Sequence, residues 1–204
     1  IFSKMLDQMI SRNADIACCG MKILGTETPH INLSEWQEEY DRDDCIQLLI
    51  SHTGTGDFYM NKIFRRELFD GIRLPVGKYF EDIFSMYKVF DKADKVVCVK
   101  EPLYLYRIHG QSISHSAQFS PKIMDYAYAC QAEWNYVKAN RPSYTEMAAA
   151  KYANAINQLS KKPAILHAKS EEAKKCFGIL KKLFLQDIIS IEDNKYCSNR
   201  LKYE

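Results

Sequence analysis

The chain has 204 residues, of which 47% are hydrophobic and 12% aromatic, so it is long enough to bury a substantial core as one or two globular domains. Its formal net charge of +2 is too small for the bulk electrostatic attraction on which nucleic-acid-binding proteins depend. The sequence shows no secretory signal and no apolar run near the roughly 18 residues of a membrane span, so we expect no segment to cross a membrane.

Seven cysteines are spread along the chain, and none of them forms a Cys-x-x-Cys pair. The odd number and the irregular spacing argue against a disulfide framework or a zinc site and favour reduced thiols in the cytoplasm. Several lie in apolar runs, where a free thiol packs as a small hydrophobic side chain. They are Cys18, Cys19, Cys45, Cys98, Cys130, Cys176 and Cys197.

The first part of the chain alternates predicted helices and strands. Apolar residues at helical spacing predict an amphipathic helix over residues 1–13, and the apolar run 15–24 predicts a buried strand. Residues 25–40 are polar and predict a loop or loose hairpin, in which Trp36 is either a packing residue or a surface for stacking on a sugar. Residues 41–44 are typical of an N-cap and an acidic first turn, so we do not interpret these aspartates as a metal motif.

Residues 61–69 predict a short helix with Asn61 and Lys62 at its start. Lys62 is followed by Arg65 and Arg66, and the guanidinium groups are suited to an anionic ligand such as a diphosphate. A solvated basic face is an equal alternative for the two arginines, and the sequence does not decide between these interpretations.

A turn at Pro75 and Gly77 precedes a second helix, whose apolar residues recur at helical spacing and form one stripe. Glu81 and Asp82 open this helix. Asp82 lies off the stripe, on the side of Ser85 and Val89, so its carboxylate is predicted to face a cleft. The structural alternative is an ordinary acidic first turn that complements the helix dipole. The stripe consists of Ile83, Met86, Tyr87 and Phe90.

Residues 95–99 and 103–107 predict two β-strands, separated by Glu101 and Pro102. Residues alternate sides along a strand, so Arg107 and His109 are predicted to project to one side. An arginine and a histidine on one face suit the binding of a diphosphate, whereas an isolated histidine is usually structural.

From Phe119 onwards the pattern is helical, with a helix start at Ser120-Pro121 and a break at Pro163. Helices without strands predict a small helical region packed on the α/β part. The predicted helices cover residues 123–138, 144–159 and 171–188.

Lysines cluster along residues 161–182, which include the first part of the last of these segments. A basic amphipathic helix is suited to peripheral contact with an anionic membrane, at the inner face of the cell membrane in a cytoplasmic protein. A solvated lysine face over a packed core is the alternative. The lysines are Lys161, Lys162, Lys169, Lys174, Lys175, Lys181 and Lys182.

Three motifs, NKIFRRELF (61–69), GIRLPVGKYFED (71–82) and LYLYRIHGQSIS (103–114), follow one another in the chain. In this order they resemble the C-terminal half of a family 2 glycosyltransferase with the GT-A fold. The similar enzymes are bacterial and build capsule, exopolysaccharide or lipopolysaccharide. The resemblance covers residues 15–114, about half of the chain.

The resemblance implies that residues 1–118 are the acceptor-side half of a GT-A-like α/β domain and residues 119–204 a helical C-terminal region. It places the metal-binding Asp-x-Asp and the donor-binding half before Ile1, so we expect this chain to be a fragment and to be inactive alone. It further implies that Mn²⁺ or Mg²⁺ binds to the full-length enzyme and not to this part.

The implied reaction is sugar transfer from a nucleotide-sugar to a hydroxyl of a glycan or lipid-linked acceptor, with inversion. Asp82 would be the catalytic base, and Glu81 would orient neighbours or accept a hydrogen bond from the acceptor. In some relatives the histidine that matches His109 also approaches the metal, which makes His109 a candidate ligand. The residues that would bind donor or acceptor are Asn61, Lys62, Arg107 and His109.

Two other classes of function remain open. One is a non-catalytic carbohydrate-binding or structural module. The other is a helical scaffold or regulator in which Glu81 and Asp82 only cap a helix.

Overall fold

The computed structural model describes residues 1–26, 33–51, 54–108, 119–162, 170–192 and 194–197, with only the backbone of 188–192. The chain divides into two compact units. The first consists of Ile1–Leu74 and Ser85–His109, and the second of Pro75–Phe84 and Gly110–Glu204. The segment that carries Glu81 and Asp82 therefore belongs to the unit of the C-terminal helices. The domain boundary expected after residue 118 stays a prediction.

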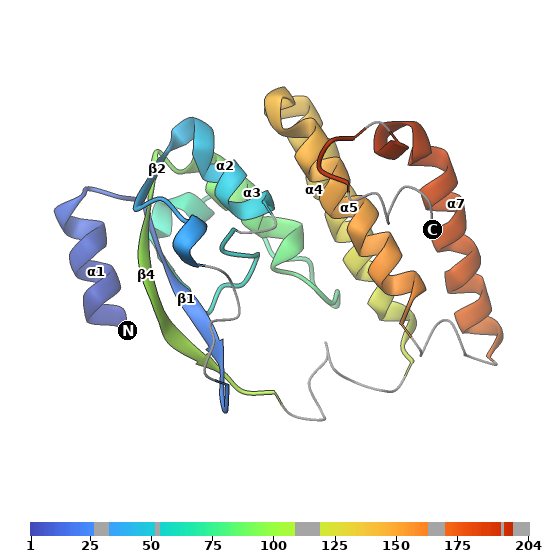
Figure 1. The fold of residues 1–204 in the computed structure, drawn as a ribbon, viewed down its shortest axis with the longest axis horizontal. Helices are drawn as coiled ribbons and strands as arrows, with labels where there is room; N and C mark the ends of the chain where they lie inside the picture. The colour runs from blue at the N-terminus through green and yellow to red at the C-terminus, as the bar shows by residue number, and fades with distance from the viewer. Residues whose placement is uncertain (27–32, 52–53, 109–118, 163–169, 193, 198–204) are drawn as a thin grey trace. The chain divides into compact units, whose positions relative to one another are not determined.

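The first unit is an α/β structure with an open, mixed, four-stranded sheet, so the predicted α/β class is confirmed (Figure 1). The strand order is β2-β4-β1-β3, in which β1 runs parallel to β4 and antiparallel to β3, and β2 runs antiparallel to β4. The elements are α1 (Phe2–Ser11), β1 (Ile16–Ile23), β2 (Glu39–Asp41), α2 (Arg42–Ile50), β3 (Lys62–Phe64), α3 (Ile83–Lys92) and β4 (Lys95–Tyr106). Helix α3 begins in the Pro75–Phe84 segment and continues into the first unit.

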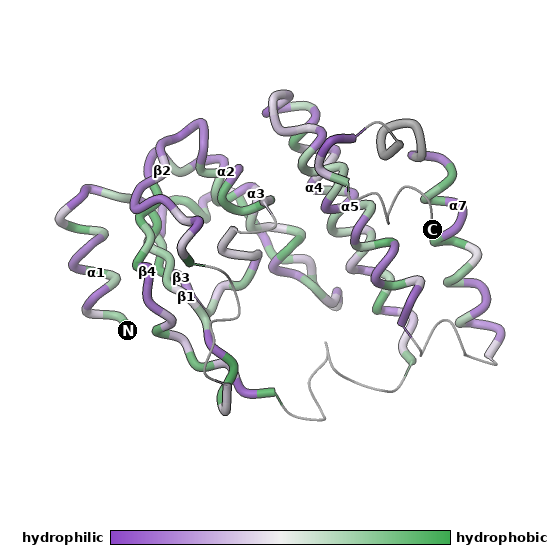
Figure 2. Tube along the Cα trace, in the orientation of Figure 1, coloured by the Kyte–Doolittle hydropathy of each residue, from purple (hydrophilic) through white to green (hydrophobic). Residues whose placement is uncertain are grey.

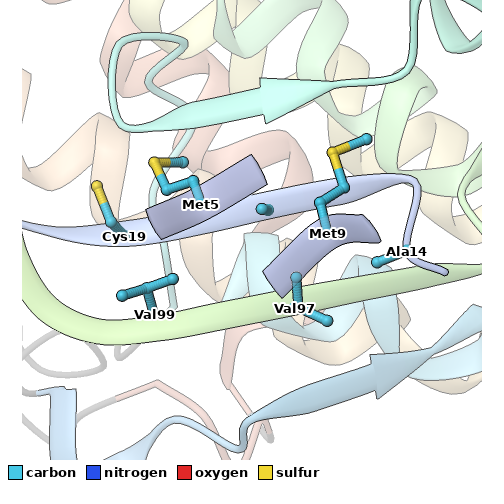
Figure 3. Close-up of a cluster of buried hydrophobic side chains, with 7 residues drawn as sticks. Met5, Met9, Ala14, Cys19, Val97 and Val99 are labelled. Carbon is cyan, nitrogen blue, oxygen red and sulfur yellow. The ribbon is translucent and has the colours of Figure 1, made fainter. Parts of the chain in front are cut away.

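Helix α1 covers one face of the sheet, and both this helix and strand β1 confirm the sequence prediction (Figure 1). Met5 and Met9 project from α1 onto β1 and β4 (Figure 3). Burying a methionine side chain contributes about 1.5–3 kcal/mol, so these two contacts fix the helix on the sheet. The remaining buried members of this cluster are Ala14, Ala17, Cys19, Val97 and Val99.

Helices α2 and α3 lie on the other side of the sheet (Figure 1). All four residues of the predicted apolar stripe of α3 are buried, which confirms the helix and its stripe. Ser85 and Val89 are also buried, with 1% and 0% of their surface exposed. The prediction that this side of the helix faces a cleft is therefore wrong for these two residues, because α3 is packed on both sides.

The helix predicted for residues 61–69 is wrong. Lys62–Phe64 forms strand β3, which pairs antiparallel with β1, and Arg66–Phe69 forms a 3₁₀ turn. The ladder to β1 satisfies the backbone groups of this short segment, and such tertiary pairing outweighs local preference.

The two strands predicted around Glu101-Pro102 are one continuous strand, β4. Cys19 pairs with Val99 and Met21 with Tyr104, so Gly20 alone lies opposite four residues of β4. A bulge of this kind accommodates a proline inside a strand. A Cβ at Gly20 would lie 2.5 Å from Cδ1 of Leu33 and 3.0 Å from the backbone oxygen of Glu101, so a larger residue would force these neighbours to shift.

The segment predicted as a loop contains a 3₁₀ turn, Leu33–Glu35, and the short strand β2, while its residues 27–32 lie outside the described residues. Trp36 is 2% exposed, so it is a packing residue and the sugar-stacking alternative is wrong. Asp41 is at the N-cap position of α2, which confirms the predicted acidic helix start.

The second unit contains α4 (Asp125–Asn140), α5 (Thr145–Ser160) and α7 (Glu171–Glu192), and these helices confirm the predicted helical segments. Polar contacts join all three. Gln131 of α4 donates a hydrogen bond to the Tyr152 hydroxyl of α5 at 3.1 Å, and this hydroxyl donates to Asp187 of α7 at 3.2 Å. Burial, and next the charge of Asp187, raise the pKa of Tyr152, so the phenol remains a neutral donor.

Hydrophilic and hydrophobic residues alternate along α7 (Figure 2). Cys176 and Leu180 are buried, whereas Ile179 is exposed. The outer face carries Lys174, Lys175, Lys181 and Lys182, and Leu185 is 55% exposed. In the part of the chain that the structure describes, no helix has the length and apolarity that crossing a membrane requires.

Candidate functional site

The acidic pair Glu81-Asp82 follows a turn with unusual backbone geometry. Gly77 has a φ of 75°, which glycine adopts without cost, and Phe80 has a φ of 59°. A left-handed conformation is unfavourable for a bulky aromatic residue, at about 1–2 kcal/mol. Such strain persists only where the surrounding contacts hold the residue in place, and it is frequent at functional sites.

The contacts that hold this turn come from the start of α4. Asp125 is 5% exposed, and its Oδ1 accepts a hydrogen bond from Nζ of Lys78 at 2.8 Å. Its Oδ2 accepts the backbone N–H of Tyr79 at 3.1 Å. The ring of Phe80 packs against the ring of Tyr126, with centroids 5.1 Å apart. One buried carboxylate and one ring contact therefore fix the residues directly before the acidic pair.

Asp82 itself lies at the N-terminus of α3. Its Oδ1 accepts the backbone N–H of Ile83, the first residue of the helix, at 2.9 Å. A carboxylate is electrostatically favoured at this end of a helix. Asp82 is half-buried and Glu81 is exposed, so the two neighbouring carboxylates have different environments.

Asn61 and Lys62 form a buried network in the first unit. Lys62 is 5% exposed, and its Nζ donates to the backbone oxygens of Phe58 and Gly56 at 2.7 and 2.8 Å and to Oδ1 of Asn61 at 2.9 Å. Nδ2 of Asn61 donates to the backbone oxygen of Cys19 at 3.0 Å. These bonds attach the loop before β3 to strand β1. Both residues therefore have a structural role in the fold, and their predicted part in ligand binding stays a prediction.

Asn61 and Lys62 lie far from Arg107 along the strands of the sheet. Lys62 lies opposite Cys18 in β1, whereas Tyr106 lies opposite Ile23, five residues farther along the same strand. At about 3.3 Å per residue, the two positions are about 16 Å apart. Arg107 directly follows Tyr106 and is exposed. His109 lies outside the described residues.

Arg65 has a contact within the fold, and the choice between an anionic ligand and a solvated face stays open for both arginines. Its Nε donates to the backbone oxygen of Ala14 at 3.1 Å and lies 3.3 Å from Oδ1 of Asp15. Arg65 thereby joins the end of β3 to the start of β1, which is a structural function. Arg66 is exposed on the 3₁₀ turn.

Among the described residues, no three His, Cys, Asp or Glu side chains lie close enough together to hold a metal ion. The Mn²⁺ or Mg²⁺ expected in the full-length enzyme stays a prediction, because its main ligands are expected outside this chain. We therefore derive no step through a metal from these residues.

The sequence pattern does not reveal the part that Asp125 and Tyr126 take in this site. The helix start at Ser120-Pro121 predicts that Asp125 lies in or near a first helical turn, where acidic residues are common. Nothing local indicates that this carboxylate is buried, or that its partners lie 46 and 47 residues earlier.

No family model matches the chain, and no curated protein matches it significantly.

Proposed function

We propose that this chain is the acceptor-side part of a glycosyltransferase of the family 2, GT-A type. The full-length enzyme would transfer a sugar from a nucleotide-sugar to a glycan or lipid-linked acceptor in cell-surface polysaccharide synthesis. The three ordered sequence motifs and the mixed sheet with helices on both faces support the proposal. The observation that carries it is the strained turn at Phe80, which presents Glu81 and Asp82 at the start of α3.

In this proposal Asp82 is the general base. Its carboxylate takes the proton of the acceptor hydroxyl while the acceptor oxygen forms a bond to the anomeric carbon. The bond from that carbon to the nucleoside diphosphate breaks on the opposite side, so the configuration inverts. A positioned base typically contributes 10²–10⁴ in rate. Exposed Glu81 is placed to accept a hydrogen bond from another acceptor hydroxyl.

Asp125 is a positioning residue in this proposal. It binds the side chain of Lys78 and the backbone of Tyr79, and both residues directly precede the strained Phe80. Fixing this turn fixes the direction in which the following carboxylates project. Reacting groups must be held in a near-attack arrangement, and small displacements cost large factors in rate.

The other site residues separate into two groups. Asn61 and Lys62 support the site indirectly, because their polar groups order the loop before β3. Arg107 is exposed and offers a guanidinium to a diphosphate, for which it is well suited. His109 remains its proposed companion.

The lysine face of α7 supports a further part of the proposal, peripheral contact with an anionic membrane that holds lipid-linked acceptors. Lys174, Lys175, Lys181 and Lys182 are exposed on one side of the helix, and Leu185 lies among them. Each lysine near such a surface contributes about 1 kcal/mol. Co-sedimentation with phosphatidylglycerol vesicles should be lost when Lys181 and Lys182 are both changed to glutamine.

Titration of the full-length protein with nucleoside diphosphates in the presence of Mn²⁺ tests the proposed class of function. A glycosyltransferase should bind one of them and transfer sugar from the corresponding nucleotide-sugar. A scaffold should bind none. A carbohydrate-binding module should bind glycans without releasing a nucleoside diphosphate.

A further inference from the structure

A buried ammonium group lies within the loop between α2 and β3. The group belongs to Lys62, which is only 5% exposed. Its Nζ donates to the backbone oxygens of Phe58 and Gly56 at 2.7 and 2.8 Å and to Oδ1 of Asn61 at 2.9 Å. The backbone oxygen of Thr55 lies 3.4 Å from the same nitrogen. Four oxygens of the preceding loop therefore surround one cation.

The number of close oxygens matches the number of donors. A lysine ammonium group has three N–H donors and no acceptor. The bonds to Phe58, Gly56 and Asn61 all have the ordinary length of an N–H···O hydrogen bond. These oxygens thus replace the water molecules that the ammonium group would bind at the protein surface, without which a buried charge is very unfavourable.

The chemistry of the four oxygens indicates the kind of ion that the loop suits. Three are backbone carbonyl oxygens and one is a side-chain amide oxygen, so all four are neutral. Sites for Ca²⁺ and Mg²⁺ usually include carboxylates. Carbonyl oxygens, in contrast, replace the hydration shell of a monovalent ion in K⁺ channels. The loop therefore has the ligands of a monovalent cation site.

Contacts that do not involve Lys62 hold these oxygens in place. Nδ2 of Asn61 donates to the backbone oxygen of Cys19 at 3.0 Å, and the N–H of Cys19 donates to the backbone oxygen of Asn61 at 2.9 Å. The N–H of Thr55 donates to the backbone oxygen of Leu48 in α2 at 3.1 Å. The loop is thus attached to β1 and α2, and we expect it to keep its form when the side chain of Lys62 is shortened.

We propose that residues 55–61 form a binding site for a primary ammonium ion, in which the side chain of Lys62 is the permanent occupant. The native protein thereby supplies its own cation and takes none from solution. Removal of this side chain leaves the same oxygens around an open site, and a free primary ammonium ion binds there. The ammonium group of Lys62 then belongs to the fold and is not a ligand of a diphosphate, whatever the reaction of the full-length protein.

The variant Lys62→Ala tests the site, because the atoms that it removes correspond to propylammonium. Its melting temperature should rise and then level off as propylammonium chloride is added. Tetramethylammonium chloride is the matched salt, since this ion has the same charge but no N–H donor. At saturation we expect propylammonium to raise the melting temperature by at least about 2 °C more than tetramethylammonium does. Equal effects of the two salts, or a variant that stays unfolded in propylammonium, would overturn the proposal.

Two further variants locate the bound ion. Lys62→Met fills the site with a neutral side chain of similar length, so it should not respond specifically to propylammonium. Lys4→Ala removes a lysine of α1 whose side chain is 58% exposed, and it should not respond specifically either. A response of either variant as large as that of Lys62→Ala would place the ion elsewhere and contradict the proposal.

Acetylation of the native protein gives a measurement that needs no variant. Brief treatment with N-acetoxysuccinimide modifies accessible lysines, and mass spectrometry of the peptides measures the rate at each position. Lys62 should react at least about 10-fold more slowly than Lys4, because its amine is exposed only when the loop opens. Similar rates at the two positions would show that the ammonium group of Lys62 is not enclosed, and the proposal would be wrong.

Discussion

Asp125 accepts the backbone N–H of Tyr79 at 3.1 Å, although the two residues are 46 positions apart in the sequence. The same carboxylate binds Lys78, so it holds the turn before Glu81 and Asp82 by a backbone and a side-chain contact. In the proposed function, this relationship connects the helical C-terminal part of the chain to the catalytic carboxylates.

Asp125→Ala should therefore lower both stability and activity. The substitution removes the acceptor of the part-buried Tyr79 N–H and the partner of Lys78, and a lost hydrogen bond costs about 0.5–1.5 kcal/mol. Urea unfolding of the variant measures this loss, and kcat of the full-length enzyme measures the effect on positioning. Asp7→Ala, at an exposed position of α1, is the control and should change stability by less than about 0.5 kcal/mol. Equal stability of the two variants would contradict the role of Asp125.

A comparison of Phe80→Gly with Phe80→Ala tests the strained backbone. Both variants lose the ring contact with Tyr126, but only alanine retains the cost of a φ of 59°. Phe80→Gly should therefore be more stable than Phe80→Ala by about 1 kcal/mol, the reverse of their order in a helix. If alanine is the more stable residue at this position, the left-handed conformation of Phe80 is wrong.

Lys62→Met separates the structural role of this residue from ligand binding. Its ammonium group satisfies the backbone oxygens of Gly56 and Phe58, and methionine cannot donate to them. We expect a loss of about 1–3 kcal/mol in the free energy of unfolding. Normal stability together with weaker nucleotide-sugar binding in the full-length enzyme would instead identify Lys62 as a ligand-binding residue.

Glu39 should contribute stability that depends on pH. The hydrogen bond from Arg12, and next that from Lys95, lower the pKa of Glu39. A lowered folded pKa means that the contribution is complete above the ordinary value of about 4.3 and is lost as the pH falls through the lower folded value. The melting temperature of the protein should therefore exceed that of Glu39→Gln at pH 6, and the difference should shrink at pH 3. Glu67→Gln, at an exposed position, is the control.

The elements with a strong local pattern could be predicted from the sequence. The apolar stripe of α3 and the helical spacing in α1, α4, α5 and α7 depend on residues a few positions apart, and the structure has these helices. Strand β3 could not be predicted, because its ladder partner β1 lies more than 40 residues earlier. The continuity of β4 through Pro102 could not be predicted either, because it depends on a bulge opposite Gly20, about 80 residues earlier in the chain.

In the candidate site, too, the features that depend on neighbouring residues could be predicted from the sequence, and those that depend on distant contacts could not. Glu81 and Asp82 are visible in a sequence motif, and Asp82 does lie at the start of a helix. The conformation of Phe80 and the burial of Asp125 result from contacts between segments that are distant in the sequence. No local sequence pattern therefore predicts either feature. The burial of Asn61 and Lys62 has the same origin, since both bond to segments that only the folded sheet brings close.

The activity of Asp82→Asn in the full-length enzyme tests the central claim most directly. Asparagine keeps the shape of the side chain and an oxygen that accepts the N–H of Ile83, but it is not a base. Sugar transfer, measured as release of nucleoside diphosphate at saturating substrates, should fall at least about 10²-fold while the melting temperature and donor affinity stay near those of the unmodified enzyme. Retention of most of the activity would contradict the account and leave Asp82 as a helix cap.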